Sequence, residues 1–197
     1  MNSLFERAKS IILNPSETWT KIKQEDTSIG KLYTSYASVL ALIPALAQFI
    51  GYSIIGYSFM GTHFRLSIGS SIGNAIVSYV LTLAGLFVIA YIADAIAPNF
   101  NSTKNLTNAF KAITYSMTPL WIAGIFYIIP QLSVLAILAG LYGLYLFYLG
   151  LPLLMDTPKE KALGYVIVVV VVTVVIYLII GAIAGALFSI NPMVGTY

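Results

Sequence analysis

Long apolar stretches separated by short polar segments dominate the chain from Leu32 onward. The longest stretch lies between Lys111 and Asp156, contains no charged residue, and is interrupted near its middle by Pro130 and Gln131. One crossing of a bilayer needs about 20 apolar residues, so this stretch is long enough for two helices joined by a turn. Backbone polar groups inside a bilayer must find partners within the protein, which favours helices. The pattern predicts a membrane-embedded helical hairpin.

The remaining apolar stretches predict further crossings of similar length. Each is bounded by polar, glycine-rich or proline-containing residues, as expected where a helix reaches the membrane surface. We predict an all-α fold: an integral membrane bundle of five transmembrane helices preceded by short amphipathic helices. The predicted spans are residues 32–57, 72–97, 112–129, 132–155 and 163–188, within a transmembrane domain over residues 32–190 that is followed by an external tail over residues 191–197.

Residues 1–31 carry a different pattern, in which apolar and charged positions alternate at helical spacing. Between residues 4 and 12 the apolar positions fall on one face, which is typical of a short amphipathic helix lying in the membrane interface. The Asn-Pro-Ser-Glu run that begins at Asn14 resembles a helix start. The second short helix would place Trp19 and Ile22 either against lipid headgroups or against the bundle.

Composition supports a membrane protein and excludes several kinds of chemistry. The chain is 59% hydrophobic and only 9% charged, whereas soluble domains are about a quarter charged. It has no cysteine, which excludes disulfides and thiolate sites, and a single histidine, which is too few for a histidine-built metal site. We therefore expect no metal and no cofactor. The basic residues are not clustered beside aromatic residues, so we expect membrane lipids rather than nucleic acid as partners.

The placement of basic residues predicts the orientation. With five spans and a cytoplasmic N-terminus, Arg65 is the single basic residue on the external side. This asymmetry follows the positive-inside rule. We predict a protein of the cytoplasmic (inner) cell membrane with a cytoplasmic N-terminus and an external C-terminus. The basic residues then on the cytoplasmic side are Arg7, Lys9, Lys21, Lys23, Lys31, Lys104, Lys111, Lys159 and Lys161.

One acidic residue, Asp94, falls inside a predicted span. A charge within a membrane is costly, so such a residue is a candidate functional group. The predicted topology brings Lys111, Tyr115, Asp156 and Lys161 to the same membrane level. Together with Asp94 they form a candidate polar cluster, which could bind an ion, a lipid headgroup or a peptide. The alternative is structural: Asp94 pairs with Lys111 or Lys161 and fixes the register of the bundle.

Other residues have a structural and a functional interpretation. Pro119, in the middle of the third predicted span, is either a static kink or a hinge. Gly181 and Gly185 have the spacing of close-packed membrane helices, within the bundle or between two copies in a homo-oligomer. Tyrosines recur along the fourth span and either line a polar path or bond to backbone carbonyls of adjacent helices. These are Tyr142, Tyr145 and Tyr148.

Several of these residues carry a resemblance to a known family. The chain shows Lys111 and Tyr115 leading to Thr118-Pro119, and an NPSETW stretch near the N-terminus. A GLYGLYLFYLG segment follows Pro130 and leads to Lys161-Ala162. Over residues 100–162 in particular, the chain resembles prokaryotic members of the Yip family. The resemblance implies five spans with a cytoplasmic N-terminus and an external C-terminus. Eukaryotic members bind Rab-type GTPases and act in vesicle traffic.

The sequence shows no paired nucleophile and base, no phosphate-binding glycine loop and no metal-ligand set, so we do not expect an enzyme. We expect a protein that organises or shapes the membrane and recruits membrane or cytoplasmic protein partners at its cytoplasmic face. The alternative is a small channel or transporter for an ion or small solute that uses the polar cluster around Asp94.

Overall fold

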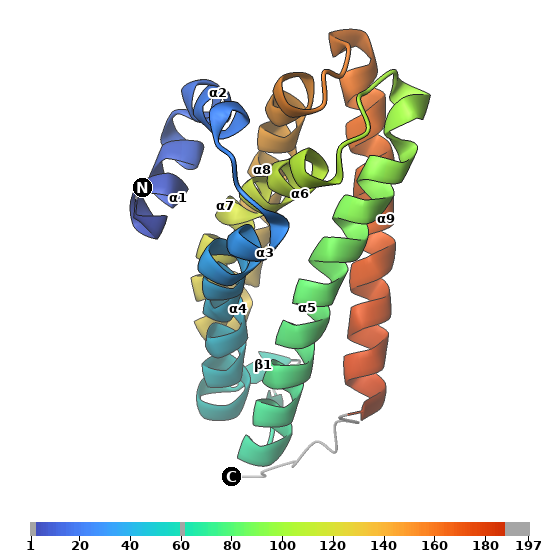
Figure 1. Ribbon diagram of the computed structural model, residues 1–197. Coiled ribbons are helices and arrows are strands. Elements are labelled where there is room, and N and C mark those ends of the chain that lie inside the picture. Colours follow the sequence, from blue (N-terminus) through green and yellow to red (C-terminus); the bar gives the residue numbers. More distant parts are fainter. Residues whose placement is uncertain (1–2, 60–61, 188–197) are drawn as a thin grey trace.

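The computed structural model describes residues 3–59 and 62–187. Within these ranges the chain is almost entirely helical, and long helices run side by side along one direction (Figure 1). The predicted external tail and Phe188 lie outside the described residues. A helical bundle is therefore confirmed as the fold.

The first half of the chain forms two short helices, a long helical rod, a hairpin and a second rod. The rod α3–η1–α4–η2 is continuous, with π-helical turns at η1 and η2. The elements are α1 (Leu4–Leu13), α2 (Pro15–Gln24), α3 (Ile29–Leu32), η1 (Tyr33–Ala37), α4 (Ser38–Ile50), η2 (Gly51–Ile55), β1 (Tyr57–Phe59), β2 (Thr62–Phe64), α5 (Ile68–Ile96) and η3 (Ala97–Phe100).

The second half contains two more long helices and a broken segment before them. The elements are α6 (Leu106–Ser116), α7 (Thr118–Ala123), η4 (Gly124–Ile128), η5 (Pro130–Leu132), α8 (Ser133–Leu154) and α9 (Lys159–Leu187). In the first half, α2 begins at Pro15 with Asn14 before it, as predicted. The antiparallel pair β1 and β2 occupies part of what was predicted as a loop, with Ser58 opposite His63.

Four segments of the described chain are long and apolar enough to cross a membrane: Ile29–Ile55, Ile68–Phe100, Pro130–Leu154 and Lys159–Ala186. The third predicted span, residues 112–129, is not a continuous helix. It is divided among α6, α7 and η4, with Met117 between the first two. Pro119 lacks an N–H and its ring crowds the preceding helical turn, which is compatible with a break at this point.

The broken segment nevertheless follows the first rod. α6 contacts α3, α7 contacts α4, and η4 contacts both α4 and η2. Two close backbone approaches fix this arrangement: Gly124 lies against the ring of Pro44, and Gly51 lies against the Tyr127 carbonyl. The segment therefore runs parallel to the first rod, with its start beside α3 and its end beside η2.

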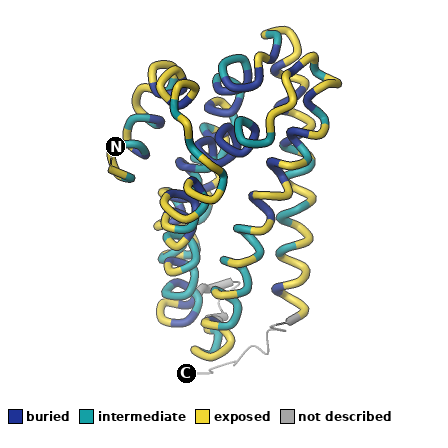
Figure 2. The backbone as a smooth tube through the Cα atoms, in the orientation of Figure 1, coloured by how far each residue is buried: buried dark blue, intermediate teal, exposed yellow. Residues whose placement is uncertain are grey.

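Buried residues concentrate in the half of the bundle near α2 (Figure 2). In α5 they lie between Gly85 and Asp94, apart from Ser71 at the other end. In α9 they lie mainly between Ala162 and Val169. Large apolar side chains elsewhere on these helices are exposed, as suits a surface in contact with lipid.

The two N-terminal helices pack against this buried half. Ile11 of α1 and Trp19 and Ile22 of α2 are fully buried. α1 contacts α7, and α2 contacts α8. Of the two environments predicted for Trp19 and Ile22, the structure shows the bundle rather than lipid headgroups.

Candidate functional site

The residues of the predicted polar cluster lie at the end of the bundle where α2, residues 97–108 and residues 154–159 meet. We call this the polar end (Figure 1). Residues 4–26, which we call the N-terminal arm, cover one side of it. The contacts there divide into three groups rather than one cluster.

Lys111 joins α6 to the arm. Its Nζ donates a hydrogen bond to the Glu25 carbonyl oxygen at 2.6 Å and lies 3.5 Å from the Ile22 carbonyl oxygen. These carbonyls are at the C-terminal end of α2, where helix carbonyls lack partners and cations are favoured. Lys111 therefore caps α2.

Tyr115, one turn after Lys111, lies in an aromatic group beneath the arm. Its ring meets the Trp19 ring edge-on with centroids 6.1 Å apart, and the Tyr36 ring at 4.8 Å. The Arg7 guanidinium lies 5.9 Å from the Tyr115 ring centroid and forms an ion pair with Glu25. Cation–π contacts at this distance are favourable. Lys111 and Tyr115 thus both hold the arm.

The aromatic group around Tyr115 also contacts the chain at the helix break at Met117. The hydroxyls of Tyr36 and Thr118 are hydrogen-bonded at 2.8 Å, and both residues are buried. On the other side of the break, a Cβ added at Gly143 of α8 would lie only 2.5 Å from the Ser116 carbonyl oxygen. Pro119 is buried at the start of α7. Its use as a hinge stays a prediction.

Asp94 lies apart from Lys111, in the last turns of α5. It is 5% exposed, and its Oδ1 has no hydrogen-bond partner within the described residues. Next to it, the Tyr165 hydroxyl of α9 donates to the Ala93 carbonyl oxygen at 2.5 Å. The Tyr165 ring is stacked on Phe100 with centroids 4.7 Å apart. Asp94 is therefore buried on α5, where this helix packs against α9.

The predicted pairing of Asp94 with a lysine is not made. The ion pairs among the described residues are Arg7–Glu25, Lys21–Glu17 and Lys23–Asp156. The Lys111 ammonium is occupied by the end of α2, and Lys161 is exposed in the first turn of α9. The structural alternative for Asp94, a register-fixing ion pair, is therefore wrong in this structure. Binding by Asp94 stays a prediction.

Asp156 has a role in the loop between α8 and α9. It adopts a left-handed backbone (φ 51°), lies 3.5 Å from Lys23 Nζ, and accepts a hydrogen bond from the Thr103 hydroxyl at 3.2 Å. Nearby, the Thr103 N–H donates to the Met155 carbonyl oxygen and the Ser102 hydroxyl donates to that of Thr157. These bonds join residues 97–108 to the α8–α9 loop.

Residues of the fourth and fifth predicted spans have distinct surroundings. The Tyr142 hydroxyl donates to the Ile12 carbonyl oxygen at 2.7 Å, which is the backbone-bonding role considered for this tyrosine. Gly181 and Gly185 are exposed, and a Cβ at either would meet nothing within 4 Å. The described chain therefore does not pack against these glycines, and pairing with another copy stays a prediction.

Sequence reasoning missed the roles of Arg7, Glu25 and Tyr36. Arg7 precedes the buried Ile11 by four residues, so it lies on the buried face of α1, and this spacing was a usable signal. No comparable pattern marks Glu25 or Tyr36. Groups of three or more potential metal-ligand residues are absent from the described part of the chain.

Four apolar spans, an enclosed polar end and a broken helix beside the first rod define a multi-pass helical membrane protein. The Yip1 domain family matches residues 9–188. The chain belongs to this family, which confirms the resemblance seen in the sequence.

Two curated relatives show how far the likeness extends. Both are named inner membrane protein YohC, one from Escherichia coli K12 and one from Escherichia coli O6:H1 CFT073. Each is 27% identical over 156 residues, which is 77% of this chain and 80% of the relative. No solved structure matches the chain significantly.

Proposed function

We propose that this protein is a non-enzymatic organiser of the inner cell membrane, which uses its N-terminal arm to act on the lipid surface and to recruit protein partners. The observation that carries the proposal is an exposed apolar face on a helix that is fixed to the bundle. Phe5 and Leu13 of α1 are 69% and 62% exposed, and Lys9 is exposed between them.

The spacing of these residues supports insertion into a membrane interface. Positions four apart lie on the same face of a helix, so Phe5, Lys9 and Leu13 form one stripe. Apolar residues with a lysine among them are typical of helices that lie in the headgroup region. The opposite face, with Ala8 and Ile11, is buried against the protein.

The attachment of the arm gives the inserted helix mechanical support. Tyr142 holds the end of α1, Arg7 joins α1 to Glu25, and Lys111 holds the end of α2. A helix inserted into one leaflet favours curvature of that leaflet, and a helix bonded to a transmembrane bundle cannot leave the surface independently. The same arm presents exposed charges, including Glu17 and Lys21, to protein partners.

The proposal includes five crossings with the polar end in the cytoplasm. The broken segment over residues 106–128 runs beside the first rod, which supports counting it as the third crossing. Lys23, Lys104 and Lys159 lie at the polar end, whereas Arg65 precedes α5 at the other end. By the positive-inside rule, this distribution supports a cytoplasmic polar end and a cytoplasmic N-terminus.

Reconstitution tests the proposal. Purified protein at high density in vesicles of phosphatidylethanolamine and phosphatidylglycerol should produce tubules or smaller vesicles, seen by cryo-electron microscopy. The double variant Phe5→Ser, Leu13→Ser should lose this effect while keeping its melting temperature, because both side chains are exposed. Glu17→Gln, an exposed change on α2, is the matched control. Unchanged vesicle shape with the wild-type protein would contradict the proposal.

A second candidate function is a small channel or transporter. The single observation that favours it is the buried, unpaired carboxylate oxygen of Asp94. A buried carboxylate oxygen without a partner is costly, and in transport proteins such groups bind the transported ion or proton. Cation or proton flux into proteoliposomes that Asp94→Asn abolishes would favour this function. Flux no greater than in protein-free vesicles would reject it.

A further inference from the structure

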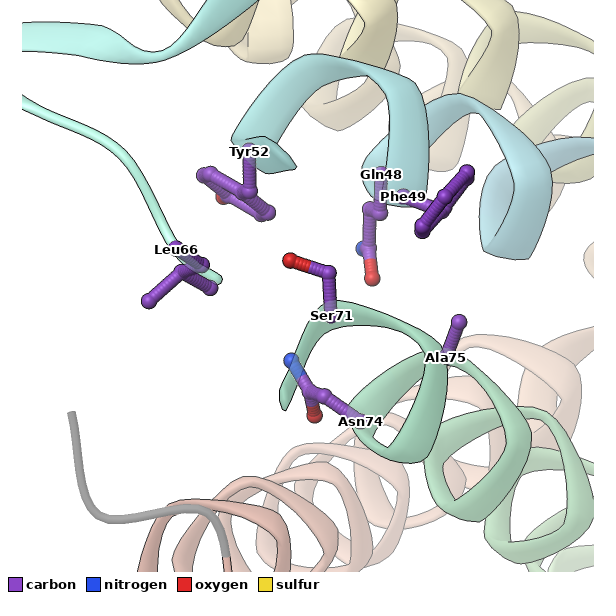
Figure 3. Close-up of a pocket in the computed structure, with 7 residues that line it drawn as sticks. All are labelled: Gln48, Phe49, Tyr52, Leu66, Ser71, Asn74 and Ala75. Atoms are coloured by element: carbon purple, nitrogen blue, oxygen red, sulfur yellow. The ribbon is translucent and has the colours of Figure 1, made fainter. Parts of the chain in front are cut away.

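A small hollow lies at the end of the bundle opposite the polar end (Figure 3). It is lined by the end of the first rod, Leu66 in the segment that leads into α5, and the first two turns of α5. The free space amounts to about 10 Å³, close to what a single water molecule requires. The lining residues are Gln48, Phe49, Tyr52, Leu66, Ser71, Asn74 and Ala75.

Ser71 is the unusual member of this lining. It is 3% exposed, and its Oγ has no hydrogen-bond partner within the described chain. Serine hydroxyls in membrane helices normally find a partner, because an unpaired polar group is costly away from water. Figure 3 shows the Ser71 oxygen directed toward the side of the hollow where Tyr52 and Leu66 lie. The hollow therefore has a buried hydroxyl that no described residue satisfies.

Two amides stand beside this hydroxyl. Gln48 comes from the first rod and Asn74 from α5, and both are set in otherwise apolar spans. The Asn74 Oδ1 accepts a hydrogen bond from the Ser78 hydroxyl at 3.1 Å, so its NH₂ group stays available. Hydroxyl and amide groups can each donate to and accept from a hydroxyl of a ligand. The lining contains no charged side chain, which favours an uncharged group in the hollow.

The surroundings of the hollow indicate what else the ligand carries. Arg65 is exposed and directly precedes Leu66, whose N–H donates to the Tyr52 carbonyl oxygen at 3.0 Å. An arginine at this level suits a phosphate group. On the same end of α5, Ile68, Ile72 and Ile76 are 64%, 45% and 59% exposed, an apolar surface on which acyl chains can lie.

We propose that this hollow binds the headgroup of an anionic, hydroxyl-bearing glycerophospholipid. A headgroup hydroxyl enters the space between Gln48, Ser71 and Asn74, the phosphate meets Arg65, and the acyl chains follow α5. Ser71 lies in the first turn of α5, which places the hollow near the end of a span, at the depth of headgroups. The site is at the opposite end from the arm, so it is independent of the proposed function.

Native mass spectrometry of the purified full chain tests the site with two lipids of identical acyl chains. Phosphatidylglycerol has free headgroup hydroxyls beyond its phosphate, and phosphatidic acid has none. Wild-type protein should retain phosphatidylglycerol more strongly. Ser71→Ala should weaken that retention about threefold to tenfold, the effect of one hydrogen bond, and leave phosphatidic acid unchanged. Arg65→Gln should weaken both lipids, and Ser70→Ala, the exposed neighbour, should weaken neither.

A second measurement separates binding from folding. Because the Ser71 hydroxyl has no partner in the protein, Ser71→Ala should not lower the melting temperature in lipid-free detergent. Equal retention of the two lipids, or retention of phosphatidylglycerol unaffected by Ser71→Ala, would overturn the proposal. Competition by free glycerol phosphate at equal concentration would assign the site to a soluble ligand instead. A high-resolution structure in the presence of phosphatidylglycerol would also overturn the proposal if it showed only an ordered water in the hollow.

Discussion

At the scale of single residues, Lys111 shows how a charge can be buried for a structural reason. The sequence predicts that it lies at the same membrane level as Asp94. In the structure, the Lys111 ammonium donates a hydrogen bond to the Glu25 carbonyl oxygen at the end of α2, at 2.6 Å. Only the packing of α2 on the bundle reveals this partner, because the two residues are 86 positions apart in the chain.

Replacing Lys111 should loosen the N-terminal arm. Lys111→Met removes a charge-assisted hydrogen bond, a loss of about 1.5–3 kcal/mol, so trypsin should cut faster at the exposed Lys21 and Lys23. Lys161→Met, an exposed change at the same end, is the matched control and should leave the rate unchanged. The measurement is the rate of cleavage in detergent. Equal rates in the two variants would mean that Lys111 does not hold the arm.

Two glycines that look alike in the sequence should respond differently to substitution. A Cβ at Gly143 would come within 2.5 Å of the Ser116 carbonyl oxygen, whereas one at Gly181 would meet nothing within 4 Å. Overpacking of this kind costs about 1–3 kcal/mol. Gly143→Ala should therefore lower the melting temperature in detergent, and Gly181→Ala should not. The same shift in both variants would contradict the packing of α8 on the α6–α7 break.

At the scale of elements, apolar runs predicted four helical crossings and their order well. They failed for residues 112–129, where the expected helix is divided among α6, α7 and η4. Pro119 was a visible signal for a kink. What the sequence could not show is that Tyr36 and Gly143 meet the chain on either side of the break, since these contacts depend on how helices distant in sequence pack.

The break should survive the loss of its proline. Because Tyr36 bonds to Thr118 and α8 presses against Ser116, Pro119→Ala should not restore a straight helix. Spin labels at Lys104→Cys and Ile129→Cys can report the end-to-end length of the segment without interference, since the chain has no cysteine. The distance between labels should be the same with and without Pro119→Ala. A longer distance in the variant would show that the proline alone breaks the helix.

At the scale of the whole molecule, burial is uneven: the half near α2 is well packed, and side chains in the other half are mostly exposed. Charge counting predicted that the basic residues gather at one end, which agrees with their positions. It could not predict that Asp94, Lys111 and Asp156 each have separate surroundings there. Composition gives the membrane level of a residue, whereas its neighbours depend on the rotation and packing of each helix.

We propose that residues 106–128 cross the membrane, with the polar end in the cytoplasm and the turn at Pro130 outside. Labelling of single cysteines with a membrane-impermeant maleimide in intact cells tests it most directly. Cysteines replacing Arg65 and Gln131 should be labelled in intact cells, and those replacing Lys104 and Lys159 only after permeabilisation. Labelling of Lys159→Cys in intact cells, or protection of Gln131→Cys until permeabilisation, would contradict the account.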